Sequence, residues 1–149
     1  MPYVLIGLLA VMLSGIFTSV NNFEQKTSTQ AEAKAISGNM MVYRNYVTAY
    51  AVANNTVTGT IADSALALPG WYNRIVSIRN YVENGKGYVY FFQGNQGDMA
   101  YAIVKLGNQA INAGIKKNGI LVNPMSSTNY VSPVSLPSAI PDDSVVIAP

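Results

Sequence analysis

The chain contains no cysteine and no histidine, and only 11% of its residues are charged. The lack of these two residue types excludes disulfides, Cys/His zinc sites, haem ligation by histidine, thiolate nucleophiles and Ser-His-Asp triads. The nine Lys and Arg residues are scattered singly, apart from Lys116 and Lys117. Nucleic-acid binding needs clustered positive charge. We therefore expect no nucleic-acid partner, and the sequence indicates no catalytic residue, cofactor or metal site.

Charge is absent altogether from the run between Tyr3 and Val20. As a helix this run would be roughly 27 Å long, close to the hydrocarbon thickness of a bilayer. Pro2 is tolerated in the first turn of a helix. We therefore expect residues 1–20 to form a transmembrane anchor. The residues assigned to the anchor are Tyr3, Leu5, Leu8, Leu9, Val11, Leu13, Ile16, Phe17 and Val20.

A cleaved signal peptide and a buried core helix are the alternatives to a retained anchor. Signal peptides have a basic start and a small-residue cleavage motif, but no Lys or Arg precedes this run and no Ala-x-Ala lies within it. The first charged side chain is Glu24, and so long an uncharged run is unusual in a small domain. The very short segment before the run favours a cytoplasmic N-terminus. The protein would then be a single-pass inner-membrane protein with its C-terminal domain in the periplasm.

Residues 21–55 are expected to form a long helical stalk after the anchor. The sequence from Thr29 to Glu32 matches a capping box, so the helix can restart there. Beyond it, apolar side chains recur at alternating spacings of four and three, on one face of the helix. This stripe either packs on the domain's own sheet or forms a seam between copies in a homo-oligomer. Its members are Ile36, Met40, Tyr43, Val47 and Tyr50.

A small α+β domain is expected over residues 56–124. Residues 55–61 are rich in β-branched side chains, and residues 74–82 have an apolar centre, so each segment predicts a strand. Asn84-Gly85 is the strongest hairpin signal in the chain, because both positions tolerate positive φ. It should join residues 74–82 to residues 86–92 as antiparallel neighbours.

A second helix is predicted to begin at Gly97-Asp98, with Asp98 as its N-cap. Lys116 and Lys117 would lie in its last turn, where cations complement the helix dipole. Asn118-Gly119 would stop the helix, and residues 120–122 would add a short strand. The apolar side of the helix would consist of Met99, Ile103, Leu106, Ala110 and Ala113.

Residues 125–149 are rich in Pro and Ser and predict an extended tail. Within it, Val145–Ile147 is apolar and predicts an edge strand. Asp142 and Asp143 lie either in a solvated loop or at a cation site, and two carboxylates alone form a poor cage. The fold class expected is α+β. An N-terminal transmembrane helix would continue into a long helix, which packs on a small antiparallel sheet with a second helix and a Pro-rich tail.

The single tryptophan and the ten tyrosines belong to residue types enriched in protein interfaces. Trp71 and Tyr72 follow a turn at Pro69-Gly70. We expect Trp71, with Tyr72 beside it, to contact a partner protein. The alternative is that Trp71 closes the core.

Three segments carry a resemblance to a known family: LALPGWYNRI at Leu66–Ile75, NGILVNP at Asn118–Pro124 and LPSAIPDDSVV at Leu136–Val146. With the order of anchor, long helix, strands, helix and tail, they make the chain similar to PilM-type proteins of the type IVB thin-pilus systems of conjugative plasmids. The resemblance runs nearly end to end. It implies a small inner-membrane protein of a pilus assembly or basal-body complex, with no enzymatic role.

A type IV pilin or pseudopilin is the nearest alternative, since these subunits also carry an apolar N-terminal helix that runs into a small α/β head. A prepilin would have a basic leader, a Gly before the cleavage site and an early Glu, whereas the first acid here is Glu24. An envelope enzyme is disfavoured because His, Cys and acidic clusters are lacking. We therefore expect a non-enzymatic, membrane-anchored protein whose partners are the lipid bilayer and other pilus-assembly proteins.

Overall fold

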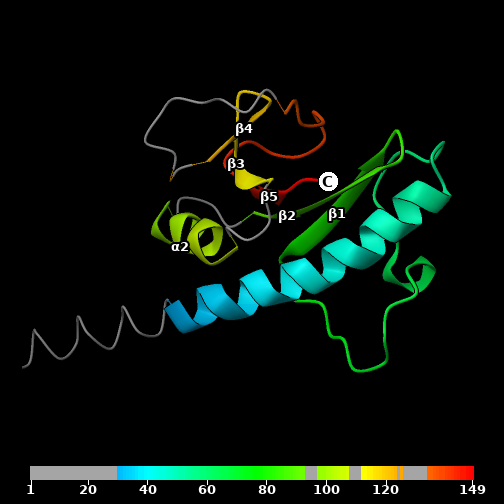
Figure 1. Cartoon of the computed structure of the whole chain (residues 1–149), viewed down its shortest axis with the longest axis horizontal. Coiled ribbons are helices and arrows are strands. Elements are labelled where there is room, and N and C mark those ends of the chain that lie inside the picture. Colours follow the sequence, from blue (N-terminus) through cyan, green and yellow to red (C-terminus); the bar gives the residue numbers. More distant parts are fainter. Residues whose placement is uncertain (1–29, 93–96, 108–111, 124, 126–133) are drawn as a thin grey trace, which may run out of the picture. The chain divides into compact units, whose positions relative to one another are not determined.

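The computed structural model describes residues 30–92, 97–107, 112–123, 125 and 134–149. The predicted anchor and Thr29 of the predicted capping box lie outside these residues. Among the helices described, none has the length and apolar character needed to cross a bilayer. Residues 33–149 form one compact unit, in which two helices and a five-stranded antiparallel sheet give an α+β fold (Figure 1).

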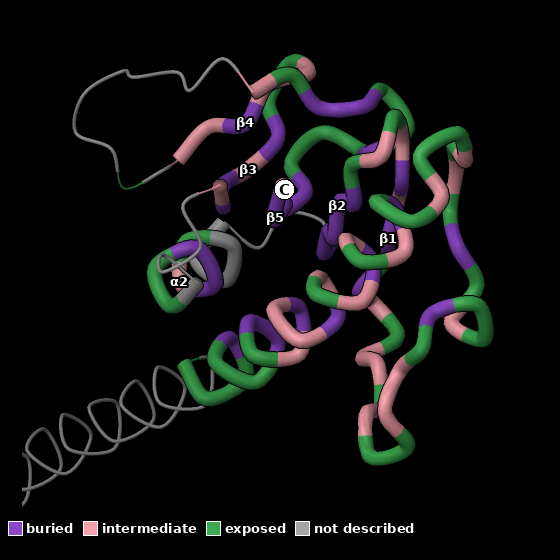
Figure 2. The backbone as a smooth tube through the Cα atoms, turned by 45° about the vertical axis from the view of Figure 1, so that its right-hand side comes forward, coloured by how far each residue is buried: buried purple, intermediate pink, exposed green. Residues whose placement is uncertain are grey.

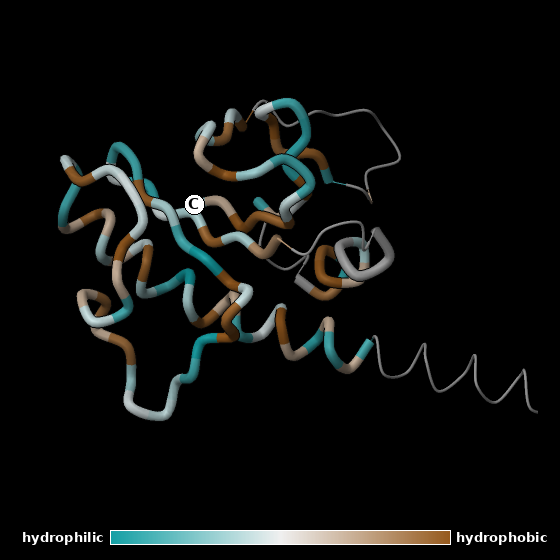
Figure 3. Tube along the Cα trace, turned by 180° about the vertical axis from the view of Figure 1, so that it is seen from behind, coloured by the Kyte–Doolittle hydropathy of each residue, from teal (hydrophilic) through white to brown (hydrophobic). Residues whose placement is uncertain are grey.

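The first described helix spans residues 30–53 and is followed by a turn at residues 54–56. Asn54 closes it, because its backbone N–H and its Nδ2 both donate to the Tyr50 carbonyl, at 2.9 and 3.0 Å. Hydrophobic and hydrophilic residues alternate along this helix (Figure 3), and one face is buried in the core of the sheet. This agrees with the interpretation that the stripe covers the domain's own sheet. The buried hydrophobic residues of this face are Ala33, Ile36, Met40, Tyr43, Val47 and Ala51.

The sheet has the strand order β1-β2-β5-β3-β4, and every neighbouring pair is antiparallel. A short 3-10 helix, η1, precedes β1, and the second α-helix, α2, lies between β2 and β3. The elements are η1 (Asp63–Ala65), β1 (Ile78–Glu83), β2 (Lys86–Phe91), α2 (Gly97–Gly107), β3 (Ala113–Lys117), β4 (Ile120–Val122) and β5 (Val145–Ile147).

Two Asn-Gly turns build the two hairpins of the sheet. Asn84 and Gly85 have φ of 52° and 72° and join β1 to β2, so this predicted hairpin is confirmed. Asn118 and Gly119 have φ of 50° and 78° and join β3 to β4 in the same way. The predicted helix stop at Asn118-Gly119 is therefore wrong.

The second helix is shorter than predicted, since α2 ends at Gly107 and β3 begins at Ala113. Ile103 is buried on the helix, Leu106 is 45% exposed, and Ala113 is buried in a strand. Met99 and Ala110 are among the side chains that are not described. Lys116 and Lys117 lie in β3, where no helix dipole acts on them.

β5 lies in the middle of the sheet, so the prediction of an edge strand is wrong. It pairs with β2 on one side and β3 on the other, and Val145, Val146 and Ile147 are all buried. A strand that is apolar on both faces is typical of a position enclosed by layers on both sides. The two hairpins are joined in one sheet through β5.

Two further strand predictions need correction. Within residues 55–61, only Gly59 pairs, in an isolated bridge with Val82. The backbone N–H and carbonyl of Ile61 are bonded to the Asn80 side chain, so they are not available to a strand partner. Residues 74–77 stay outside β1, which begins at Ile78.

The sheet is covered on both faces. On one face, Ile78, Val89 and Ile147 pack with residues of the first helix and α2. On the other, Tyr88, Tyr90 and Val146 pack with side chains of the segment 134–140. Figure 2 shows that much of β2 and β5 is buried. The described part of the tail is therefore a layer of the domain.

Lys116 fixes this tail layer to the sheet. Its side chain is only 5% exposed, and its Nζ donates to the carbonyls of Pro137 (3.0 Å) and Ile140. The Nζ also lies 3.7 Å from Asp142 Oδ1. Asp142 and Asp143 are both exposed, and no group of three metal-binding side chains occurs among the described residues.

Further backbone contacts cover both outer strands. On β1, Gly59 and Val82 exchange two hydrogen bonds of 2.9 Å. On β4, the Leu121 N–H donates to the Val134 carbonyl at 3.1 Å, and the Leu136 N–H donates to Gly119 at 2.8 Å.

Candidate protein-contact site

The loop of residues 66–77 projects away from the sheet, past the first helix (Figure 1). We call it the Trp71 loop. Trp71 is 71% exposed and Val76 is 84% exposed, and residues 64–73 carry no charged side chain. The exposure of Trp71 contradicts the alternative in which this residue closes the core. Tryptophan is among the residue types that carry most binding energy in protein interfaces, so the loop is a candidate contact surface.

Stacked aromatic rings support the loop from below. Tyr43 projects from the first helix and is fully buried. The Tyr72 ring lies on it with centroids 6.0 Å apart and an interplanar angle of 8°. Trp71 then meets the Tyr72 ring edge-on, with centroids 6.2 Å apart. Such aromatic pairs add stabilisation beyond the area that they bury, so the exposed indole lies next to a fixed ring.

Asn39 binds the loop to the helix. Its Nδ2 donates to the Asn73 carbonyl at 2.8 Å, and its Oδ1 accepts from the Tyr72 hydroxyl at 2.7 Å and from the Ile75 N–H at 3.3 Å. An amide can donate and accept at once, which allows one side chain to hold three residues of the loop. Asn39 adjoins Met40 on the helix, and so lies beside the buried stripe.

An ion pair joins the loop to η1. Arg74 Nε donates to Asp63 Oδ2 at 2.8 Å, and the guanidinium also donates to the Ile78 carbonyl. The Tyr43 hydroxyl donates to Asp63 Oδ1 at 2.5 Å, and the Arg74 guanidinium carbon lies 5.7 Å from the centre of the Tyr43 ring. The carboxylate therefore bridges the helix and the loop.

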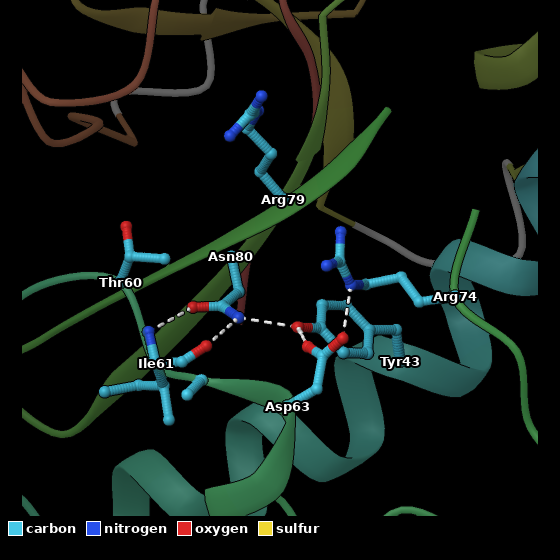
Figure 4. A pocket seen from close by; sticks show the side chains of 8 residues that line it. Tyr43, Thr60, Ile61, Asp63, Arg74, Arg79 and Asn80 are labelled. Carbon is cyan, nitrogen blue, oxygen red and sulfur yellow. Dashed lines mark hydrogen bonds and ion pairs between the residues drawn. The ribbon is translucent and has the colours of Figure 1, made fainter. Parts of the chain in front are cut away.

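Asn80 completes this polar group from β1. Its Nδ2 donates to the Tyr43 hydroxyl at 2.6 Å and to the Ile61 carbonyl at 2.8 Å, and its Oδ1 accepts from the Ile61 N–H at 2.8 Å. The group lines a cavity of about 400 Å³ (Figure 4). Arg79 leaves β1 on the opposite side from Asn80 and points away from Asp63 (Figure 4).

The pKa shifts indicate a group that stays fixed at neutral pH. Burial raises the pKa of Tyr43, and its bond to Asp63 raises it further. Burial also raises the pKa of Tyr72, to about 12. Partial burial alone would raise the pKa of Asp63, but hydrogen bonds from Tyr43 and Arg74 and the charge of Arg74 lower it. Asp63 is therefore ionised and both tyrosines are neutral, and these groups bind one another and hold the loop.

The structure separates the residues predicted for an interface. Trp71 is exposed and Tyr72 is half-buried beside it. Ile36, Met40, Tyr43 and Val47 lie in the domain's own core, and Tyr50 packs against that core. The predicted anchor residues lie outside the part of the chain that is described.

Asn39, Asp63 and Asn80 were not predicted as residues of the site. Arg74 was predicted only as the first residue of a strand. One signal was available, since Asn80 is a polar residue inside a predicted half-buried strand, where an amide needs partners. Nothing local marks Asp63, whose partners Arg74 and Tyr43 lie 11 and 20 positions away in sequence.

Comparison with known proteins gives a family match and two structures. The sequence model of a family described as PilM matches residues 8–148. A crystal structure of a PilM protein from Escherichia coli B7A is 16% identical, with a TM-score of 0.54, over 80% of this chain and 92% of that chain. A PilM protein from Pseudomonas aeruginosa 2192 is 27% identical, with a TM-score of 0.45, over 79% of this chain and 93% of the other. No curated protein matches the sequence.

Proposed function

The chain belongs to the PilM family, and from this we propose that it is a non-enzymatic, membrane-anchored component of a type IVB pilus assembly or basal-body apparatus. It acts through contacts with other pilus proteins. The observation that carries the proposal is the family match, which extends over residues 8–148 and so includes both the folded unit and most of the uncharged N-terminal run.

The sequence supports the anchor within this proposal. The run from Tyr3 to Val20 has no charged residue and, as a helix, matches the thickness of a bilayer. In this proposal the domain from residue 33 onward lies in the periplasm.

Action through contacts is supported by the Trp71 loop. An exposed tryptophan that meets a fixed tyrosine ring edge-on is of the residue type that most often anchors an interface. Asp63 is paired with Arg74, and the Tyr43 hydroxyl is bonded to Asp63 and Asn80, so these groups hold the loop that makes the proposed contact.

N-terminal sequencing of the membrane-extracted protein tests the anchor against a pilin-like subunit. We expect a terminus at Met1 or Pro2 and resistance to extraction by alkaline carbonate. Recovery of the protein in sheared pilus fractions, with a processed terminus, would favour the pilin-like alternative instead.

A reporter that is active only in the periplasm, fused after Pro149, tests the orientation. We expect an active fusion. A matched fusion before Met1 should be inactive, and the reverse pattern would reject a periplasmic domain.

A further inference from the structure

We infer that the Trp71 loop is a preformed docking site for an uncharged, apolar surface on another protein of the pilus apparatus. The inference rests on the proposed function, because it takes the partner from that apparatus. It goes further by assigning the contact to one loop and by stating the chemistry of the surface that the loop receives.

The Trp71 loop is held rigidly. The exposed Trp71 meets the Tyr72 ring edge-on, and Asn39 binds Tyr72, Asn73 and Ile75. The Asp63–Arg74 pair joins the loop to η1. A loop held in this way loses little conformational entropy when it binds, and a rigid tryptophan is a frequent centre of binding energy.

Charge is absent from most of the Trp71 loop. Residues 64–73 carry no charged side chain, and Arg74, the cation that follows them in sequence, is bound to Asp63 and the Ile78 carbonyl. A charged group on the partner would lose its water against this surface without gaining a counter-charge, which is costly. The complementary face is therefore apolar and uncharged.

A second copy of this chain and a lipid surface are the other two possible occupants of the site. A second copy would have to offer an apolar recess for the indole. Among the described residues, the cavity beside Tyr43 is instead lined by the charged side chains of Asp63 and Arg74 and by the Asn80 amide. A lipid surface would favour cations free to reach headgroups, and Arg74 is not free. These observations favour a different protein.

Photo-crosslinking in cells that carry the whole pilus system tests the inference. The full-length chain receives benzoylphenylalanine in place of Asn73, which is exposed on the loop, and the adducts are sequenced by mass spectrometry. We expect an adduct with an uncharged, apolar segment of another pilus protein. The same crosslinker in place of Val52, which is 67% exposed on the helix, should not give this adduct.

Variants then test the chemistry. Trp71→Ala should lower the adduct yield by about tenfold or more, whereas Trp71→Phe should keep most of it. Gly70 has nothing within 4 Å of a built Cβ and no positive φ, so a side chain fits there. Gly70→Ala should keep the yield and Gly70→Asp should abolish it. This pair tests the absence of charge even if Trp71→Ala reduces folding.

The inference is overturned by an adduct with a charged segment, with a second copy or with lipid alone, by the lack of any adduct, or by a yield that Trp71→Ala and Gly70→Asp leave unchanged. Each of these results leaves N-terminal sequencing and membrane fractionation unaffected, so failure of this inference is distinguishable from failure of the proposed function.

Discussion

The side chain of Asn80 makes backbone hydrogen bonds that a neighbouring strand would otherwise make. Gly59 pairs with Val82 of β1 in an isolated bridge. Two residues further along the chain, the backbone N–H and carbonyl of Ile61 bond to the side-chain amide of Asn80 instead of to a strand. The same amide reaches the Tyr43 hydroxyl. One residue therefore connects β1, the segment before η1 and the first helix.

Replacing Asn80 with alanine should lower the free energy of unfolding by about 2–4 kcal/mol, because the Ile61 N–H and C=O lose their partners in a buried place. Urea unfolding of the detergent-extracted protein measures this change. Arg79→Ala is the matched control, since Arg79 is exposed in the same strand and should change stability by less than about 0.5 kcal/mol. Equal losses in the two variants would contradict the assigned role.

Asp63 should make part of the stability depend on acid pH. Its pKa is lowered from 3.8 in the folded protein, so the folded state favours the ionised form. The contribution is fully present above the unfolded pKa and is lost as pH falls through the lower folded pKa. The stability difference between the native protein and Asp63→Asn should be largest near neutral pH and should shrink below pH 3.8. Urea midpoints measured from pH 7 to pH 2.5 check this, and a constant difference would count against it.

At the scale of elements, the same dipeptide was interpreted correctly once and wrongly once. Asn84-Gly85 predicts a hairpin because apolar, β-branched residues lie on both sides. Asn118-Gly119 forms the same turn, but the apolar periodicity after Gly97 favoured one long helix up to Lys117. The positive-φ preference of Asn-Gly is local and could be predicted. The end of α2 could not be predicted, because residues 113–117 form a strand by pairing with β4 and β5, and local periodicity does not record that pairing.

The position of β5 shows the same limit. The apolar character of Val145–Ile147 predicts a strand. The sequence of three residues does not determine which strands will pair with it. The central place follows from β2 and β3, which lie far away in sequence and both pair with β5. For the site, the sequence singled out Trp71 but left two alternatives, a partner contact or a core position. The residues that support it were not predicted, because Asn39 and Asp63 act through long-range contacts.

Gly87 sets the distance between β2 and the first helix. A Cβ at this position would lie 2.9 Å from the Val47 carbonyl and from the Thr48 nitrogen, and these backbone atoms cannot rotate away. Gly87→Ala should therefore force the strand and helix apart and lower the free energy of unfolding by about 1–3 kcal/mol. Thermal and urea unfolding measure the loss.

Gly38→Ala is the matched control for Gly87→Ala. Gly38 lies in the first helix with nothing within 4 Å of a built Cβ. The substitution should raise stability by about 0.5–1 kcal/mol, because glycine weakens helices. Two glycine-to-alanine changes with the same sign would contradict this account of the packing.

For the molecule as a whole, the C-terminal segment completes the sheet. β1-β2 and β3-β4 are local hairpins, and β5 pairs with both of them. Ala148 continues the connection, since its N–H donates to the Asn112 carbonyl at 2.9 Å. The folded unit is therefore closed by nearly the last residues of the chain.

Removing residues 144–149 should abolish cooperative unfolding, because the two hairpins lose the strand between them and the core loses residues from both faces. Circular dichroism melting of the detergent-extracted chain measures this. Removal of Pro149 alone leaves β5 paired and should retain a cooperative transition. A truncated chain that melts like the full chain would show that the hairpins can join without β5.

The covering of both outer strands has a consequence for crowding. An open strand edge is a template on which a neighbouring chain can add its own strand, and repeated addition leads to aggregation. Here Gly59 covers part of β1, and residues 134–136 cover β4. Copies brought together at high local concentration are therefore less prone to join their sheets edge to edge.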